Sequence, residues 1–321
     1  MPKPLRAKTA RAKMARAKMA SGELLALLKW GAIGWADWRS RHPQAEPDLS
    51  AADLRELDLS QVDLGKTDLS RACLVQTNLM GANLREANLS HANLYEANLT
   101  AADLSGADLR EAHLIGVNLS FTELQGANLR GADLREGNLR GANLSLANLI
   151  GTDFRQANLK EADCSDANLM KADLTHARLN GAIFTGANLS CANFCCAELV
   201  AAYFPKASLY RTLFRDAQLV RAFLVGAVLV EADLERSNLS WANLSRANLT
   251  SAHCPGANLH GANISRADLR KTNLQGANLR NTNLTKANLS GANLQNADLF
   301  FADLSNADLR GAIMPNGSLH P

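Results

Sequence analysis

A five-residue period runs through this chain without interruption and restricts the folds that are open to it. From Leu49 to Leu319 every fifth residue is apolar, which gives fifty-five consecutive words of the form Ala-Asn/Asp-Leu-x-x. Central positions whose numbers end in 9 are always leucine, and all nine departures from leucine end in 4. A period of five matches neither the about 3.6 residues of an α-helical turn nor the roughly two-residue alternation of a strand. The pattern therefore requires another closed path for the backbone.

A chain that turns a corner every five residues closes one square coil after four words. Stacked coils pair their backbones at the strand spacing of about 4.8 Å, so fifty-five words give about fourteen coils and roughly 65 Å of rod. The leucine and the small residue two positions before it point inward, and the other three residues point outward. Bulkier residues at the small positions would overpack the narrow core. The sequence therefore predicts an all-β solenoid over residues 47–319.

The words resemble those of the pentapeptide-repeat proteins, a family of right-handed quadrilateral β-helices. The resemblance covers residues 47–319 and is carried by words such as Ala-Asn-Leu-Arg-Glu, which begins at Ala82. It implies a right-handed quadrilateral β-helix of about fourteen coils. Family members that antagonise quinolones often carry loops inserted in the rod, and the unbroken phase of the words counts against that role here.

Five phenylalanines take central positions in place of leucine. Centres twenty residues apart stack on one face and centres ten apart lie on opposite faces, so we expect Phe184 and Phe204 to lie across the core from Phe194 and Phe214. Interleaved rings of this kind make a thicker section of ordinary core, because a close-packed interior leaves no ligand pocket. The full set is Phe154, Phe184, Phe194, Phe204 and Phe214.

The chain before the first word divides into a basic tail and a helical segment. Residues 1–20 hold seven basic residues and no acidic ones, which predicts a disordered tail able to contact anionic membrane or nucleic acid. Residues 21–46 form a capping segment and linker. Apolar residues at three- and four-residue spacing predict one amphipathic α-helix over residues 21–40, which lies over the open edge of the first coil. Its apolar positions are Leu24, Leu28, Gly31, Trp35 and Trp38.

The opposite end of the rod lacks such a cover. After Leu309 the chain ends in RGAIMPNGSLHP, which has no helical pattern. The open edge would fray, be blunted by proline, or pair with another molecule. Some pentapeptide-repeat proteins dimerise end to end at their C-termini, and the resemblance therefore adds a C-terminal end-to-end homodimer as a hypothesis.

Motifs for catalysis or cofactor binding do not occur in the sequence. There is no GxxxxGK[ST] phosphate loop, no GxSxG nucleophile elbow and no HExxH zinc pair. An apolar shaft with a convex outside favours a non-enzymatic protein without a cofactor. Cys191, Cys195 and Cys196 form a cluster of outward thiols, for which a metal site and a redox-sensitive surface both stay open. A face between two corners separates Cys191 from the other two.

The Asn or Asp before each central residue has a structural interpretation. Its side chain can bond to nearby backbone and favours the turns that corners require. Five consecutive aspartates, from Asp48 to Asp68, ring the first coil. In one branch of the resembled family an acidic rod imitates DNA, but outside residues 1–20 this chain has 27 basic and 31 acidic residues, a formal charge of only −4. That balance makes a poor electrostatic copy of DNA.

The most informative departure lies between Ile183 and Val230, where apolar residues take the outward Asn/Asp place. Ile183, Tyr203 and Phe223 are twenty residues apart and should stack as one column. Contiguous exposed apolar surface usually marks a contact site, although drift on a tolerant scaffold is the alternative interpretation. The sequence thus predicts a partner-binding surface made by Ile183, Tyr203, Tyr210, Leu213, Phe223 and Val228.

Three functional hypotheses follow. The preferred one is a non-enzymatic scaffold that binds a protein partner through its lateral surface. The alternatives are a DNA-mimicking modulator of a topoisomerase such as gyrase, and a membrane-associated rod anchored by the basic tail and the Trp-bearing helix. Few cysteines for the chain length, and no apolar run of about 18 residues, favour a cytoplasmic protein, with peripheral membrane attachment as an open alternative.

Overall fold

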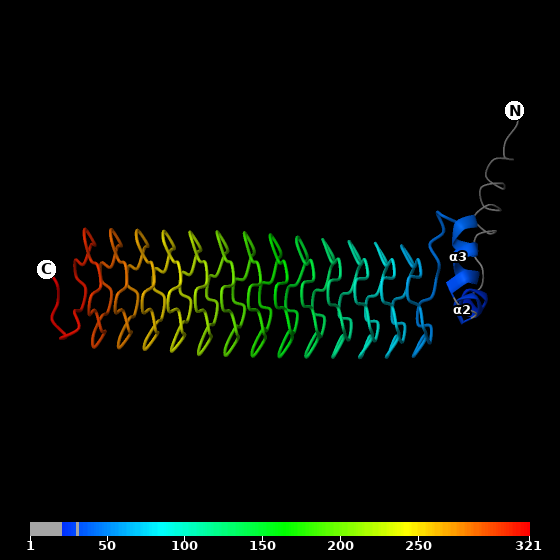
Figure 1. Cartoon of the computed structure of the whole chain (residues 1–321), viewed down its shortest axis with the longest axis horizontal. Helices are drawn as coiled ribbons and strands as arrows, with labels where there is room; N and C mark the ends of the chain where they lie inside the picture. Colours follow the sequence, from blue (N-terminus) through cyan, green and yellow to red (C-terminus); the bar gives the residue numbers. More distant parts are fainter. Residues whose placement is uncertain (1–20, 30–31) are drawn as a thin grey trace, which may run out of the picture.

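The chain winds as a right-handed quadrilateral β-helix, a straight rod with two short helices at its N-terminal end (Figure 1). The computed structural model describes residues 21–29 and 32–321. Within these ranges fifty parallel bridges join residues twenty apart, from the pair Asp48 and Asp68 to the pair Asn293 and Ile313. Four words therefore make one coil, as predicted. The basic tail and Gly31 lie outside the described residues.

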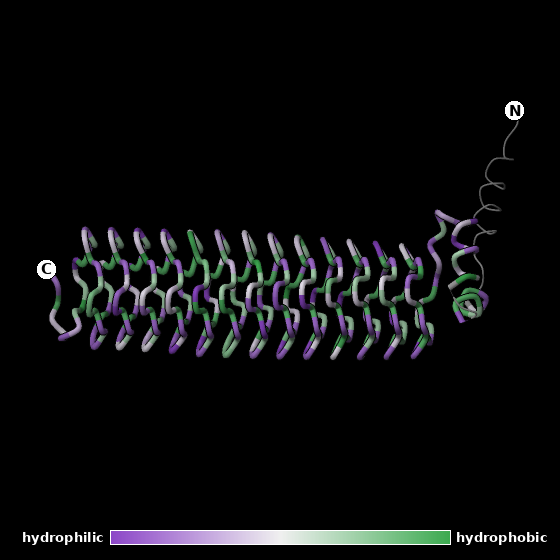
Figure 2. The backbone as a smooth tube through the Cα atoms, in the orientation of Figure 1, coloured by the Kyte–Doolittle hydropathy of each residue, from purple (hydrophilic) through white to green (hydrophobic). Residues whose placement is uncertain are grey.

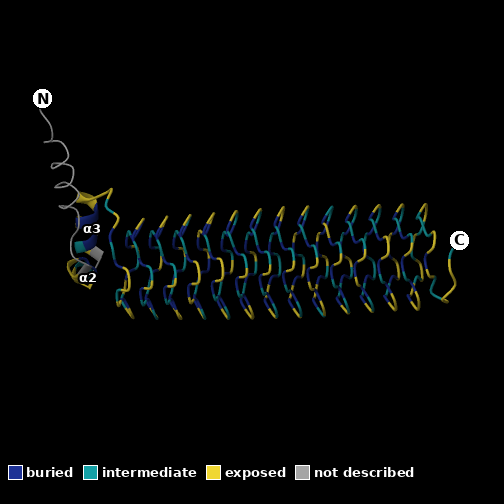
Figure 3. Ribbon diagram, turned by 180° about the vertical axis from the view of Figure 1, so that it is seen from behind, coloured by how far each residue is buried: buried dark blue, intermediate teal, exposed yellow. Residues whose placement is uncertain are grey.

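Each coil has four faces, which we name in chain order. Face A contains Leu49 and every twentieth residue after it, and faces B, C and D begin at Leu54, Leu59 and Leu64. Face A lies opposite face C, and face B lies opposite face D. All central residues from Leu49 to Leu294 are buried, and the burial pattern repeats round every coil (Figure 3). Hydrophobic and hydrophilic residues alternate with the same period along the whole rod (Figure 2).

In a word that carries Asn at its second position all five N–H groups can have acceptors, as the word from Ala87 to His91 shows. The Ala87 N–H closes the corner by donating to the carbonyl three residues before it, at 3.1 Å. The Asn88 N–H donates to the previous coil at 3.0 Å, and the N–H groups of Leu89 and His91 donate to the next coil at 2.6 and 2.9 Å. The Ser90 N–H donates to Oδ1 of Asn88 at 3.2 Å. The word is thus a complete hydrogen-bonding unit, and a shorter or longer one would leave a backbone group without a partner.

The predicted backbone role of the Asn/Asp position is confirmed, but the corner itself lies elsewhere in the word. Besides accepting the N–H two residues on, these side chains bond to one another between coils, as where Asn78 Nδ2 donates to Asp58 Oδ1 at 2.9 Å. The left-handed conformation belongs to the last residue of the word, where φ is positive at every position from Ala51 to Gly311. Asn and Asp therefore cap the coil, and the last residue of each word turns it.

The corner conformation predicts the effect of substitutions at Gly226, where φ is +65° and no atom lies within 4 Å of the place that a Cβ would take. We expect Gly226→Val to lower the free energy of unfolding by about 1–2 kcal/mol, because a β-branched residue is strained there by its own backbone. Gly226→Asn is the matched control and should change it by less than about 0.5 kcal/mol, since Asn tolerates this region. Urea denaturation followed by circular dichroism measures both, and equal stabilities would contradict the corner assignment.

The N-terminal cap consists of two helices instead of the single predicted one. Helix α2 spans Ser21–Lys29 and helix α3 spans Ala32–Arg41, and residues 30–31 between them lie outside the described residues. The cap residues Leu24, Leu28, Trp35 and Trp38 are all buried.

Two side chains of α3 occupy the hydrogen-bonding places that a preceding coil would fill. In the regular rod, carbonyls equivalent to those of Asp63 and Gly65 accept N–H groups from the coil before. Here the indole Nε1 of Trp35 donates to the Asp63 carbonyl at 2.6 Å, and the Arg39 guanidinium donates to the Gly65 carbonyl. Arg39 also pairs with the Asp63 carboxylate at 3.3 Å. Arg39 was not predicted as a cap residue from the sequence, although its four-residue spacing from Trp35 places both on one side of a helix.

This geometry makes Arg39 a stability determinant of the cap. We expect Arg39→Met to lower the free energy of unfolding by about 1–3 kcal/mol, because it leaves a buried carbonyl without a donor while keeping the apolar stem. Arg41→Met on the same helix is the control; it removes an exposed ion pair with Asp37 and should cost less than about 1 kcal/mol. Thermal unfolding compares the two variants, and the cap assignment is wrong if they lose the same stability.

The C-terminal end departs from the predicted path. After Met314 the chain reverses, the Met314 N–H donates to the Ser318 carbonyl at 2.8 Å, and Ile313 pairs with Leu319 in an antiparallel bridge. Leu319 is 71% exposed, so its prediction as a central residue is wrong. The physical reason is the Pro-Asn-Gly sequence, in which Gly317 adopts a φ of +82° and turns the strand back. The short hairpin lies against face B of the last coil.

Candidate functional site

The predicted apolar column lies on face D. Bridges join Ile183 to Tyr203 and Tyr203 to Phe223, so the three residues occupy successive coils. The rings of Tyr203 and Phe223 stack with their centroids 4.6 Å apart and their planes within 8°. Tyr203 is 42% exposed and Phe223 is 37% exposed. Because each ring lies on the other, the column presents ring edges to solvent.

The other predicted contact residues are distributed over different faces. Leu213 lies on face B, opposite the column, and Val228 lies on the neighbouring face A. Tyr210 belongs to the corner between faces A and B. The six residues therefore do not form one patch, because a ten-residue step crosses the rod. The apolar neighbours of the column are instead the corner valines Val200, Val220 and Val225.

The apolar column also changes the hydrogen bonding of the backbone. At Ser245, in the same position of a later coil, the N–H donates to Oδ1 of Asn243 at 3.1 Å. Ile183 and Phe223 have no such oxygen, and the N–H groups of Thr185 and Val225 have no acceptor among the residues that the structure describes. Face D therefore combines apolar rings with uncapped backbone donors at Thr185 and Val225, whereas the equivalent donors of Ser245 and Ser265 are capped.

The charge of face D is of one sign over several coils. Between residues 180 and 286 the face and its two flanking corners contain no acidic residue, and they carry the basic residues Lys206, Arg221, Arg246, Arg266, Arg280 and Lys286. Three of these, Arg246, Arg266 and Lys286, form one exposed column at the corner between faces D and A. Trp241, at the other corner, is 57% exposed. The apolar column thus continues into a basic surface.

The core beneath the column contains the predicted aromatic stack. Phe184 stacks on Phe204 with centroids 4.9 Å apart, and Phe194 stacks on Phe214 at 5.0 Å. The two pairs meet edge to face across the shaft, for example at 6.0 Å between Phe184 and Phe194. All four rings and Phe154 are fully buried. The four stacked rings fill the shaft beneath Tyr203.

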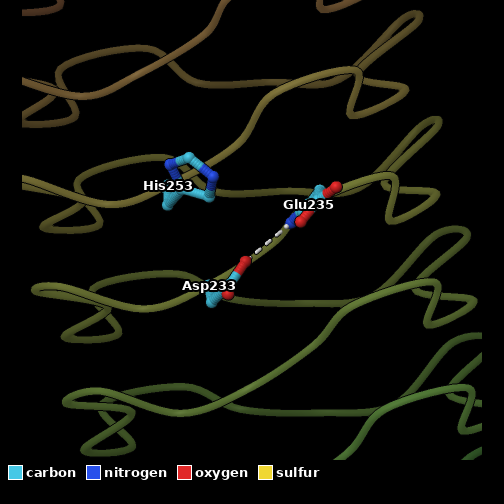
Figure 4. Close-up of side chains that lie close together, drawn as sticks. All are labelled: Asp233, Glu235 and His253. Atoms are coloured by element: carbon cyan, nitrogen blue, oxygen red, sulfur yellow. Dashed lines mark hydrogen bonds between the residues drawn. The ribbon is translucent and has the colours of Figure 1, made fainter.

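A group of potential metal ligands lies on face B. Ligand atoms of Asp233, Glu235 and His253 all lie within 4.8 Å of one another (Figure 4). Both oxygens of Asp233 are engaged, however: Oδ1 accepts the Glu235 N–H at 3.1 Å, and Oδ2 accepts Arg215 Nε at 2.5 Å. Arg236 pairs with the Glu235 carboxylate at 2.6 Å. Two guanidinium groups thus balance the two carboxylates, and the arrangement is an ion-pair network; the twenty-residue spacing of Asp233 and His253 was its sequence signal.

Comparison with known proteins identifies the repeat. The family model described as pentapeptide repeats (8 copies) matches overlapping segments that together span residues 48–316. The chain belongs to the pentapeptide-repeat family. No curated protein sequence matches it.

Several solved structures of pentapeptide-repeat proteins are similar to this one. HetL, involved in heterocyst differentiation regulation in the cyanobacterium Nostoc sp. strain PCC 7120, is 32% identical over 89% of this chain and 98% of its own, with a TM-score of 0.33. Rfr23 from the cyanobacterium Cyanothece 51142 is 30% identical over 39% of this chain and 94% of its own, with a TM-score of 0.29. QnrB1, a plasmid-mediated fluoroquinolone resistance protein, is 24% identical over 49% of this chain and 75% of its own, with a TM-score of 0.37.

The outward thiols of this pentapeptide-repeat protein are divided between two corners. Exposed Cys191 lies at the corner between faces A and B, whereas Cys195 and Cys196 lie at the corner between faces B and C. Burial raises the pKa of the Cys195 thiol. Cys164 and Cys254 are buried centres, and burial raises the pKa of Cys254 to about 12. The geometry does not bring the three outward thiols together.

Many acidic side chains of the pentapeptide-repeat rod are neutralised within their own words. The Arg55 guanidinium donates to the Asp53 carboxylate and lowers the pKa of that carboxyl to about 2. Arg310 acts in the same way on Asp308, whose pKa is also about 2. Of the described helices, neither is long and apolar enough for a membrane span.

Proposed function

We propose that this pentapeptide-repeat protein is a non-enzymatic scaffold that binds a protein partner through face D. The single observation that supports the proposal is the exposed, stacked pair Tyr203 and Phe223, set where other coils carry a polar cap. Aromatic residues are enriched at binding hot spots, because they bury a large area at a small entropic cost. The straight, filled rod holds the pair in place before binding, which reduces the entropy lost on association.

The local hydrogen bonding supports the same conclusion. A polar residue at position 223 would cap the Val225 N–H, as Asn243 does for Ser245. Retaining phenylalanine there forgoes a bond of roughly 1 kcal/mol. A loss of this size is consistent with selection for binding at the expense of stability. The paired arginines and aspartates along the rod, by contrast, give little support to DNA mimicry.

The proposal predicts that Tyr203→Asn combined with Phe223→Asn abolishes capture of the partner from native lysate while the rod keeps its circular dichroism spectrum. At position 223 the new Asn can cap the Val225 N–H, and at position 203 it restores the common residue of the word, although Pro205 has no N–H to cap. We therefore expect the fold to be about as stable as before. Affinity capture with the tagged full-length chain, followed by quantitative mass spectrometry, measures the change.

The matched control for this capture experiment is Leu146→Asn. It removes an apolar side chain that is 59% exposed and lies at the corner between faces D and A, two coils before the word that contains Ile183. Capture by this variant should equal capture by the unmodified chain. If the double variant at face D retains the same bound proteins as Leu146→Asn, face D is not the binding surface.

A further inference from the structure

The chemistry of face D restricts the kind of partner that fits it, and this inference rests on the proposed function. We infer that face D binds an acidic, apolar segment of a partner protein: its apolar side chains lie on the Tyr203–Phe223 column, and its carboxylates lie against the basic corner column. That basic column consists of Arg246, Arg266 and Lys286. The two parts of the surface follow each other along the same side of the rod.

The unpaired basic side chains beside face D favour an anionic partner. Arg280 pairs with Asp298 of face C at 3.2 Å, whereas Arg246, Arg266 and Lys286 form no ion pair with any described residue. All three side chains are exposed and lie on successive corners of coils spaced by about 4.8 Å. Three like charges at this spacing repel one another unless a counter-charge neutralises them. An anionic partner supplies that charge and gains speed of association from it.

The Tyr203–Phe223 column fits a protein segment better than a nucleic acid. Single-stranded nucleic acids bind by stacking bases on the free faces of aromatic rings. Tyr203 and Phe223 each cover one face of the other, with 4.6 Å between centroids, and Ile183 and Asn243 adjoin them in the next coils, so the pair offers mainly ring edges. Ring edges flanked by Val220 and Val225 suit aliphatic side chains, and the partly positive edges also attract carboxylate and carbonyl oxygens.

The uncapped backbone N–H of Val225 on face D favours the same kind of partner. In the two coils that follow, the N–H equivalent to that of Val225 donates to an Asn oxygen, as Ser245 and Ser265 do at 3.1 Å. The Val225 N–H has no acceptor within the described part of the chain. A carboxylate or main-chain carbonyl of the partner can accept this bond beside Phe223. A partner segment that fits face D therefore offers apolar side chains, an oxygen that accepts the Val225 N–H, and negative charge.

The test measures fluorescence anisotropy of a labelled twelve-residue peptide of alternating Asp and Leu, titrated with the full-length protein. We expect saturable binding that weakens as salt is raised. The combined variant Arg246→Asn, Arg266→Asn and Lys286→Asn should weaken it roughly tenfold or more. Asn is well tolerated in the left-handed corner conformation, so this variant should keep its fold. Tyr203→Asn combined with Phe223→Asn should weaken binding as well.

The control variant removes the same charge elsewhere. Arg130→Asn, Lys171→Asn and Lys271→Asn change the corner between faces A and B, away from face D, and should leave peptide binding unchanged. An alternating Lys and Leu peptide should not bind. Equal weakening by both triple variants, or tighter binding of a twelve-nucleotide thymidine oligomer than of the acidic peptide, would overturn the inference.

The outcome also separates this inference from the proposed function. If the column variant loses capture from lysate while the basic variant binds the acidic peptide normally, the scaffold function stands and the acidic partner is wrong. If the column variant changes neither measurement, the proposed function itself fails. If the unmodified protein self-associates and the basic triple variant does not, the surface binds a second copy of this chain. That result would overturn the acidic-partner assignment.

Discussion

The hydrogen bond from a backbone N–H to the Asn or Asp oxygen two residues before it is the interaction on which the rest of the structure depends. Four of the five N–H groups of a word have acceptors in the turn or in neighbouring coils, and this side chain supplies the fifth. Each five-residue word forms one face and places its central residue in the shaft. An inward residue therefore recurs every five positions. The leucine core and the polar cap are therefore two consequences of the same backbone path.

The exceptions to this rule are informative because the scaffold is so regular. The prolines within the words, Pro205, Pro255 and Pro315, each stand two residues after a position that lacks Asn or Asp. Proline has no N–H, so it removes the donor for which no cap is present. Val200, which follows Glu198, instead donates to Oδ1 of Asn180 one coil earlier, at 2.9 Å. Thr185 and Val225 on face D have neither a proline nor another acceptor. Among the described residues the same holds for eight other N–H groups at this position of the word, namely Val75, Ile115, Gln125, Asn180, Tyr210, Arg215, Val220 and Val230.

Much of the fold could be predicted from the sequence, because the period alone decides which residues stack. The register of Tyr203 on Phe223 and the crossing of the core phenylalanines follow from twenty-residue steps. The failures occurred where the period does not apply. The division of the cap into α2 and α3 lies before the first word, and the exposure of Leu319 depends on a turn that overrides the repeat. The role of Arg39 depends on carbonyls that are free only because the first coil has no coil before it.

The candidate site was predicted in part for a related reason. Apolar residues in outward places mark a surface. Two of them occupy equivalent places on the same face only if their numbers differ by a multiple of twenty. Leu213 and Phe223 are ten residues apart and lie on opposite sides of the rod. The basic corner column was not recognised from the sequence, because its members stand twenty residues apart among many paired arginines. Its significance appears once ion pairs can be distinguished from unpaired charges.

Residue-resolved amide hydrogen exchange tests the central claim most directly. Within one column of face D, the amides of Ser245 and Ser265 are capped by Asn side chains, whereas those of Thr185 and Val225 are not. The account predicts slow exchange at Ser245 and Ser265 and exchange at least about tenfold faster at Thr185 and Val225. Equal protection at all four amides would show that the side-chain oxygen is not what completes the five-residue word.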